Sequence, residues 1–256
     1  MFSSFWFHLA VVSSLLLLRY ILAVRLRPSS AEMRVRIQSA RETCDSLSLT
    51  LFVVFFLIQP FVAQAYYIPS DSMENTLPIG TRILASPLAA KVLPIEAGEA
   101  LVFYPPAKAR ELSSGNEGDV WIKRCIGTPG QVIEFKKNVL WRDGKVVPEP
   151  YAIWSSPGIP SVTYDLKIVG GAVYSREYDA LGQAGLWTQA RVAVSDQTAI
   201  SRATSGPVPS GKLLMLGDHR NDSLDGHFWG FLNQEAVVGR AFVSFWPPRQ
   251  IGTIGR

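Results

Sequence analysis

Two serines that lie two positions apart, Ser70 and Ser72, follow closely on an uncharged apolar run at residues 46–65. A serine hydroxyl can attack a peptide carbonyl when a nearby base accepts its proton. The structural alternative is that these serines, together with Asp71 and Glu74 in the spacing of a capping box, only cap a turn or a short helix. The serines therefore indicate catalysis only if the chain also supplies a base.

One candidate base is Lys123, which lies in the apolar, strand-like segment 120–127 ahead of a Pro-Gly turn. Because side chains alternate along a strand, Lys123 is expected on the same face as Trp121 and Cys125. A free lysine has a pKa of about 10.4, and desolvation by such neighbours favours the neutral amine that a base requires. A strand lysine whose amine simply reaches water is the structural alternative.

A second candidate base, His219, lies in the polar loop 217–227, which is flanked by apolar, strand-like residues. With Ser72 and Asp218 it could complete a Ser-His-Asp triad, because triads are recognised by the roles of their members and not by their order. A penicillin-recognising Ser-x-x-Lys enzyme is disfavoured, since no serine here has a lysine three residues later. A membrane-tethered β domain that only binds an extended chain is the non-enzymatic alternative.

Three motifs follow the second apolar run in order: Pro-Ser-x-Ser-Met, Ile-Lys-Arg and Gly-Asp-x-Arg-x-x-Ser-x-Asp. Together they resemble the motifs of bacterial type I signal peptidases, also called leader peptidases. The resemblance implies a Ser/Lys dyad, with Ser72 as nucleophile and Lys123 as general base. It also implies that Ser70 donates to the oxyanion and that the Ser223 hydroxyl orients the lysine. The supporting positions that match the family are Arg124, Gly217, Asp218, Arg220 and Asp225.

Two residues depart from the family pattern: His227 stands in place of an arginine, and Glu99 stands in place of an aspartate. Both substitutions concern the outer polar network and not the dyad. A carboxylate close to a lysine favours the charged amine. Asp218 and Asp225 are therefore expected to pair with an arginine, either Arg124 or Arg220.

The resemblance covers the second apolar run, residues 66–143 and residues 212–246. Short strand-like segments separated by turn signals predict a mostly β catalytic domain made of 66–143 and 212–256. Residues 144–211, rich in Gly, Pro and Ser, are expected to form an inserted, smaller β cap domain. Asp143-Gly144 predicts a hairpin turn. The aromatic residues at 242–246 suit either the lipid headgroups or the core.

Two apolar runs precede the motifs and are predicted to be transmembrane helices, at residues 1–24 and 46–65. The first run is long enough to span the membrane if the Arg19 side chain extends to the lipid–water interface. The alternative is an amino terminus that lies at the periphery of the membrane. The loop at 25–45 carries five arginines and is cytoplasmic by the positive-inside rule, so the catalytic region lies outside the cytoplasm. With the bacterial resemblance, this predicts a multi-pass protein of the inner membrane with a periplasmic catalytic domain. Ala-x-Ala at 63–65 leaves self-cleavage as a minor alternative.

The charge and the cysteines narrow the range of partners. The net charge of the chain is +4. The residues before position 66 contribute +3 of it, because they include six arginines and three acidic residues. The β region therefore carries only +1, which is too small a basic surplus to indicate nucleic-acid binding. Cys44 and Cys125 are expected on opposite sides of the membrane, so no disulfide is expected. The histidines and cysteines have no metal-binding spacing, and no metal or cofactor is expected.

The resemblance also implies the partners of the protein. They are the lipid bilayer and exported preproteins, whose signal peptides are cut after small residues in an Ala-x-Ala pattern. Such a substrate is expected to lie extended along the enzyme's own strands, where small pockets exclude larger side chains. Which preproteins are cut, and in what oligomeric state, is left open by the sequence.

Overall fold

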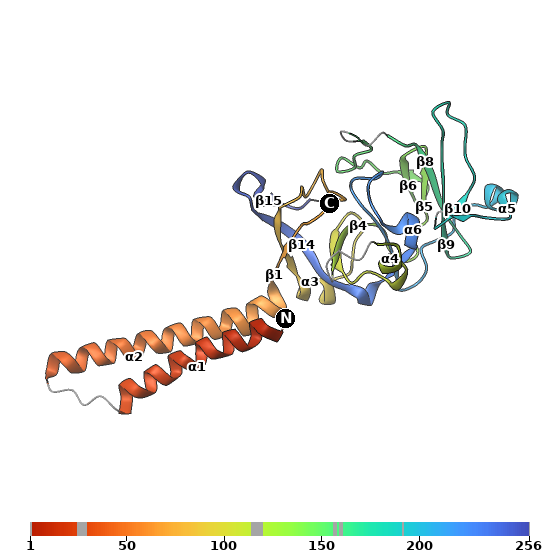
Figure 1. Ribbon diagram of the computed structural model, residues 1–256. Coiled ribbons are helices and arrows are strands. Elements are labelled where there is room, and N and C mark those ends of the chain that lie inside the picture. The colour runs from red at the N-terminus through yellow and green to blue at the C-terminus, as the bar shows by residue number, and fades with distance from the viewer. Residues whose placement is uncertain are drawn as a thin grey trace. The chain divides into compact units, whose positions relative to one another are not determined.

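The computed structural model describes residues 2–24, 30–113, 120–155, 158, 161–190 and 192–255, with the backbone alone for residues 2–5. The chain divides into two compact units, Met1–Ala63 and Gln64–Arg256. Among the described residues, the first unit is helical and the second contains the strands (Figure 1).

The first unit is a pair of apolar helices, as predicted. Helix α1 spans Phe2–Val24, and α2 spans Ala31–Phe52 and continues as a wider π-helix, η1, at Val53–Val62. Within Trp6–Val24 and within Ala31–Val62, a window of 18 residues reaches a mean hydropathy of 2.0 and 1.8, so both helices are long and apolar enough to cross a membrane.

The second helix differs from its predicted bounds at both ends. It begins at Ala31 and not at residue 46, so most of the predicted basic loop at 25–45 is helical. Ser30 accepts a hydrogen bond from the Met33 N–H at 3.2 Å and caps the helix. The helix also ends at Val62, and Gln64 already belongs to a strand.

The two helices contact each other through polar as well as apolar side chains. Arg19 Nε lies 2.5 Å from Asp45 Oδ1. The His8 ring stacks on Phe55, with the ring centroids 4.0 Å apart. A charged side chain inside an apolar helix needs such a partner, and the ion pair explains how α1 accommodates Arg19.

The second unit contains two antiparallel sheets. The larger sheet has the order β1-β2-β14-β3-β4-β12-β13, with β15 paired to β14, and the smaller has the order β11-β10-β9-β8-β5-β6-β7. The larger sheet consists of β1 Gln64–Tyr67, β2 Arg82–Ser86, β3 Ala100–Phe103, β4 Trp121–Gly127, β12 Lys212–Leu216, β13 Phe231–Asn233, β14 Val237–Trp246 and β15 Gly252–Thr253. The smaller consists of β5 Ile133–Lys136, β6 Val139–Arg142, β7 Lys145–Val146, β8 Tyr164–Val169, β9 Ala172–Glu177, β10 Thr188–Gln189 and β11 Val192–Ala193.

Short helices connect these strands. They are α3 Pro87–Val92, α4 Ala107–Leu112, α5 Gln197–Arg202, α6 Gly226–Trp229 and the 3₁₀ turns η2 Gln234–Ala236 and η3 Pro248–Gln250. The mostly β prediction for this part of the chain is confirmed.

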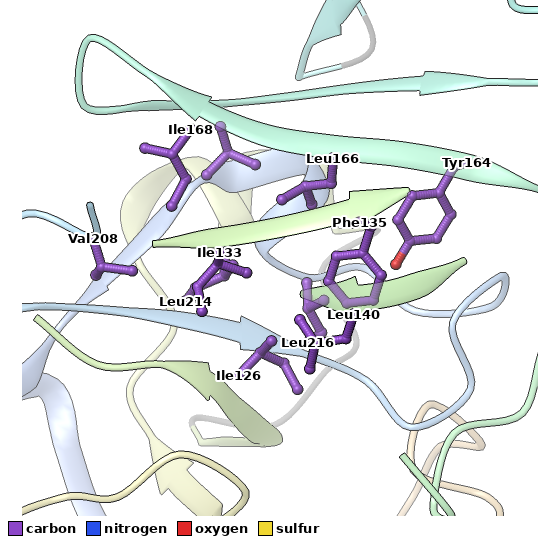
Figure 2. Close-up of a cluster of buried hydrophobic side chains, with 11 residues drawn as sticks. Ile126, Ile133, Phe135, Leu140, Tyr164, Leu166, Ile168, Val208, Leu214 and Leu216 are labelled. Atoms are coloured by element: carbon purple, nitrogen blue, oxygen red, sulfur yellow. The ribbon is translucent and has the colours of Figure 1, made fainter. Parts of the chain in front are cut away.

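The two sheets share one hydrophobic core. Figure 2 shows side chains of β4 and β12, including Ile126 and Leu216, in one cluster with Phe135 of β5 and Leu166 of β8. The second sheet already begins with β5, so the predicted domain boundary at Gly144 falls inside a sheet. A separate inserted cap domain is therefore not confirmed, because the long-range pairing of β5 with β8 joins the two parts.

Two tight hairpins organise the start of the smaller sheet. Lys137 and Asn138 join β5 to β6 with φ of 47° and 69°, and Asp143 and Gly144 join β6 to β7 with φ of 51° and 75°. Two consecutive positive φ angles are typical of the type I′ turn, whose twist matches that of the flanking strands. The hairpin predicted at Asp143-Gly144 is confirmed.

The aromatic residues at the end of β14 are not core residues. Phe242, Phe245 and Trp246 are 42%, 37% and 51% exposed. The interpretation that these residues belong to the core is wrong, and their position at the lipid headgroups stays a prediction.

Candidate active site

A serine and a lysine from distant segments meet in the second unit. Ser72 lies in the turn after β1, Lys123 lies in β4, and a hydrogen bond joins Lys123 Nζ to Ser72 Oγ. Each residue is only 6% exposed, and the Lys123 amine lies 6.0 Å from the centroid of the Trp121 ring. The interpretation of Lys123 as a surface lysine is wrong, and its predicted place on one face of β4 with Trp121 and Cys125 is confirmed.

The turn that carries Ser72, residues 69–78, is fixed by buried side chains and by backbone hydrogen bonds. Met73 and Leu77 are fully buried, and the Leu77 N–H donates to the Met73 oxygen at 2.6 Å. The Glu74 N–H donates to the backbone oxygen of Asp71 at 2.7 Å, and not to its carboxylate as a capping box requires. This turn, called the nucleophile loop below, holds Ser72 against β4.

Ser70 lies beside Ser72, the predicted nucleophile. Its Oγ is 3.3 Å from Ser72 Oγ, and either hydroxyl can donate. Both serines face a cavity of about 60 Å³ that also reaches Lys123. The cavity is lined mainly by apolar side chains, from Tyr66, Tyr67, Ile68, Pro69, Ile83, Val102, Val120, Trp121 and Ile122.

Directly after the lysine, Arg124 forms a fully buried ion pair with Asp218. Its Nε donates to Asp218 Oδ1 at 2.7 Å and its Nη2 donates to Oδ2 at 2.6 Å, a bidentate arrangement. Further N–H groups of Arg124 donate to Thr76 Oγ1 and to the backbone oxygens of Gly98 and Gly255. The predicted pairing of Asp218 with an arginine is confirmed, and the charge of this carboxylate is compensated within the site.

Asp225 is also fully buried, but its partner is not an arginine. Its carboxylate accepts hydrogen bonds from the Gly217 and His227 N–H groups at 2.8 and 3.1 Å, and it lies 2.7 Å from His227 Nδ1. Burial acts to raise the pKa of Asp225, but the charge of His227 and these hydrogen bonds outweigh it and lower the pKa. The prediction that Asp225 pairs with an arginine is therefore wrong, and His227 holds that place.

Arg220 pairs with a residue that the sequence did not single out. Its two terminal nitrogens donate to the Glu149 carboxylate at 2.8 and 2.6 Å, and its Nε donates to the Gly217 oxygen at 3.0 Å. Glu149 lies outside the three motifs on which the resemblance depends, which is why its role was missed. The other departure from the family, Glu99, pairs with Arg240 at 2.9 Å.

Gly217 permits the close approach of two loops. A Cβ at this position would lie 2.2 Å from Ser223 Oγ and 2.6 Å from the Ser72 backbone oxygen, distances that no side chain tolerates. Ser223 is buried, and its Oγ has no hydrogen-bond partner among the described residues. Its predicted role in orienting Lys123 thus stays a prediction.

His219 is close to Ser72 through its backbone and not through its ring. The His219 N–H donates to the Ser72 oxygen at 3.1 Å, whereas neither ring nitrogen has a hydrogen-bond partner among the described residues. The carboxylate of Asp218 is bound by Arg124, and the Ser72 hydroxyl is bound by Lys123. This geometry favours the Ser/Lys pair over a Ser-His-Asp triad.

Comparison with known proteins agrees with this geometry. Residues 41–246 match the family described as signal peptidase, peptidase S26. The chain belongs to this family. This signal peptidase is 30% identical over 209 residues to "Probable signal peptidase I-1" of Synechocystis sp., covering 82% of this chain and 84% of the relative. It is a type I signal peptidase and a serine endopeptidase.

Two further relatives agree. "Probable signal peptidase I-2" of Synechocystis sp. is 32% identical to this signal peptidase over 208 residues, covering 80% of this chain and 73% of the relative. "Signal peptidase IB" of Staphylococcus aureus is 29% identical over 196 residues, covering 77% of this chain and 84% of the relative. The likeness thus covers most of the length of this signal peptidase and most of the length of each of these three relatives.

Proposed function

We propose that this signal peptidase removes signal peptides from exported preproteins with Ser72 as nucleophile and Lys123 as general base. The observation that carries the proposal is the hydrogen bond between Lys123 Nζ and Ser72 Oγ in a buried, largely apolar site. The charge of the Asp218 carboxylate is compensated by Arg124, the residue next to Lys123, so Asp218 does not hold the amine in its charged form.

The chemistry follows from these positions. The neutral Lys123 amine takes the hydroxyl proton while Ser72 Oγ bonds to the carbonyl carbon of the scissile peptide. The ammonium then gives that proton to the leaving amine, and an ester to Ser72 remains. A water molecule, deprotonated by the same amine, attacks the ester and releases the signal peptide.

Ser70 and the backbone of Ser72 supply the oxyanion donors in this proposal. The Ser70 hydroxyl, 3.3 Å from Ser72 Oγ, and the Ser72 N–H lie beside the position of the developing negative charge. One such donor contributes about 2.7–4 kcal/mol to transition-state stabilisation. In this proposal the Ser223 hydroxyl orients the Lys123 amine, and Gly217 leaves room for Ser223 close to the Ser72 backbone.

The cavity beside the dyad supports a preference for small side chains. Its volume of about 60 Å³ and its apolar lining suit residues such as alanine and exclude larger ones. A preprotein chain in extended form would lie along residues 66–70 and 120–123, which line this cavity from two segments. In that arrangement the Ala-x-Ala pattern of a signal peptide would lie against the Ser72 hydroxyl.

The two apolar helices support a membrane location. We place this enzyme in the bacterial inner membrane, with residues 25–45 in the cytoplasm and the β unit on the periplasmic side, because positively charged segments are retained inside. Lipids and exported preproteins are then its partners. Self-cleavage after Ala65 is disfavoured in this account, because Gln64–Tyr67 form strand β1.

The test is cleavage of a preprotein with an Ala-x-Ala site by the full chain in detergent. Ser72→Ala should reduce cleavage to background while leaving near-ultraviolet circular dichroism unchanged. Ser210→Ala is the matched control, because Ser210 is an exposed turn residue, and it should cleave at the rate of the parent. Cleavage at the parent's rate by Ser72→Ala would refute the nucleophile assignment.

A further inference from the structure

Three potential metal ligands meet beside the nucleophile, although they come from two separate loops. Asp71 lies in the nucleophile loop between Ser70 and Ser72, and His219 and Asp222 lie in the 217–225 loop. One ligand atom of each of the three residues lies within 4.8 Å of the other two. Asp71 and Asp222 are half-buried, so the cluster reaches the surface.

The histidine of this cluster is buried and unsatisfied. His219 is fully buried, and both of its ring nitrogens lack hydrogen-bond partners among the described residues. Buried polar groups in folded proteins nearly always have a hydrogen-bond partner, because an unpaired group loses its hydrogen bonds to water and gains none from the protein. One ring nitrogen of His219 lies within 4.8 Å of a carboxylate oxygen of Asp71 and of Asp222. A ligand between these groups would satisfy it.

The two carboxylates of the cluster crowd each other. A carboxylate oxygen of Asp71 and one of Asp222 lie within 4.8 Å of each other. Two adjacent carboxylates are stabilised either by a shared proton or by a cation. Glu74 Oε2 lies 3.6 Å from His219 Nδ1 and adds a third carboxylate within reach.

We propose that Asp71, His219 and Asp222 form a binding site for a divalent transition-metal ion. An imidazole nitrogen combined with carboxylate oxygens is a donor set that suits zinc and its neighbours in the first transition row, and magnesium prefers oxygen ligands alone. The ligands lie on two loops without a metal-binding spacing, which is why the sequence predicts no metal site.

The position of the site gives it a consequence for the enzyme. A bound ion would link the nucleophile loop to the 217–225 loop, which already meet where the His219 N–H donates to the Ser72 oxygen. Because a ligand that binds only the folded state stabilises it, zinc should raise the temperature of unfolding. This inference concerns binding and stability, and it holds whether or not Lys123 is the general base.

The test is calorimetric titration of zinc chloride into the full chain in detergent, after removal of purification tags and chelator treatment. The parent should bind one zinc ion, and its unfolding midpoint should rise by about 5 °C or more when zinc is ~100-fold above its dissociation constant. Asp222→Asn removes a half-buried ligand and should weaken binding at least about tenfold. His219→Gln should do the same, and the Asp222 variant keeps the test valid if the buried histidine is needed for folding.

The control variant is Glu235→Gln, which removes a carboxylate from an exposed position and should bind zinc like the parent. Absence of zinc binding by the parent would overturn the proposal in favour of a shared proton. Equal zinc affinity of Asp222→Asn and Glu235→Gln would place the ion elsewhere and would overturn it as well. Magnesium binding as tight as zinc binding would refute the transition-metal assignment.

Discussion

Two buried ion pairs fix the 217–225 loop at its two ends, and they differ in the nature of their cation. At the start, Asp218 is held by Arg124, whose guanidinium is charged at every accessible pH. At the end, Asp225 is held by His227, whose imidazole is a cation only when protonated. The family pattern has an arginine at this second position.

The two ion pairs therefore have different structural roles in the loop. The Arg124 pair is bidentate, lies next in sequence to Lys123 and also binds Thr76 of the nucleophile loop, so it joins three segments of the site. The Asp225 pair is local, since His227 is two residues away, and its carboxylate mainly organises the backbone at Gly217. Loss of the first pair should therefore disturb more of the enzyme than loss of the second.

The largest effect is expected from breaking the first pair. Asp218→Asn leaves the Arg124 guanidinium buried without a compensating charge, which typically costs about 3–5 kcal/mol of unfolding free energy. Urea unfolding of the full chain in detergent, followed by tryptophan fluorescence, measures this loss. Glu235→Gln, with an exposed carboxylate, should change stability by less than about 0.5 kcal/mol. Equal stability of the two variants would contradict the assigned role of Asp218.

A smaller loss is expected from breaking the second pair. Asp225→Asn weakens hydrogen bonds from Gly217 and His227 to a charged acceptor, worth about 1.5–3 kcal/mol. The pKa of Asp225 is lowered in the folded protein, so its contribution is complete above the usual aspartate pKa of about 3.9. As pH falls through the lowered pKa, the contribution is lost.

The difference in unfolding free energy between the parent and Asp225→Asn should accordingly be larger at about pH 5 than at lower pH, and it should shrink as the solution becomes more acidic. Urea titrations at a series of pH values test this prediction. A difference that grows on acidification would mean that Asp225 does not lie in a charge-stabilised site.

The smallest chemical change is the addition of one methyl group at Gly217. It tests the close approach of Gly217 to Ser223 and to the Ser72 backbone. Gly217→Ala places a Cβ against Ser223 Oγ and the Ser72 oxygen and should cost about 1–3 kcal/mol in stability, with a further loss of cleavage rate. Gly252→Ala is the matched control, because a Cβ there meets nothing within 4 Å. Cleavage at the parent's rate by Gly217→Ala would show that the loops do not need this approach.

Local sequence patterns predicted the centre of the site well. Strand alternation was sufficient to place Lys123 among buried neighbours, and the turn residues at Asp143-Gly144 were sufficient to predict a hairpin. Both features depend on residues that are close together in the chain. The mostly β character of the second unit followed from the same kind of pattern.

Features that depend on long-range pairing were not predicted. The second sheet begins at β5 because β5 pairs with β8, and no local signal marks that boundary. Glu149 becomes the partner of Arg220 only when the fold brings the two together across 71 positions. The early start of α2 was missed for another reason, since its amino-terminal half is polar and carries only a serine cap as a local signal.

The most direct test of the central claim is the cleavage rate of Lys123→Arg and Lys123→Met. A guanidinium keeps the positive charge but cannot release its proton at accessible pH, and methionine has no basic group. Both variants should lose about 10²–10⁴-fold or more in rate, since that is what a positioned general base contributes. Lys91→Arg, an exposed substitution in α3, should cleave like the parent.

Near-ultraviolet circular dichroism confirms that each variant is folded, so that a loss of rate reports on chemistry. Both Lys123 variants should be folded and essentially inactive, and Lys91→Arg should be fully active. Near-normal cleavage by folded Lys123→Arg would contradict the Ser72–Lys123 dyad.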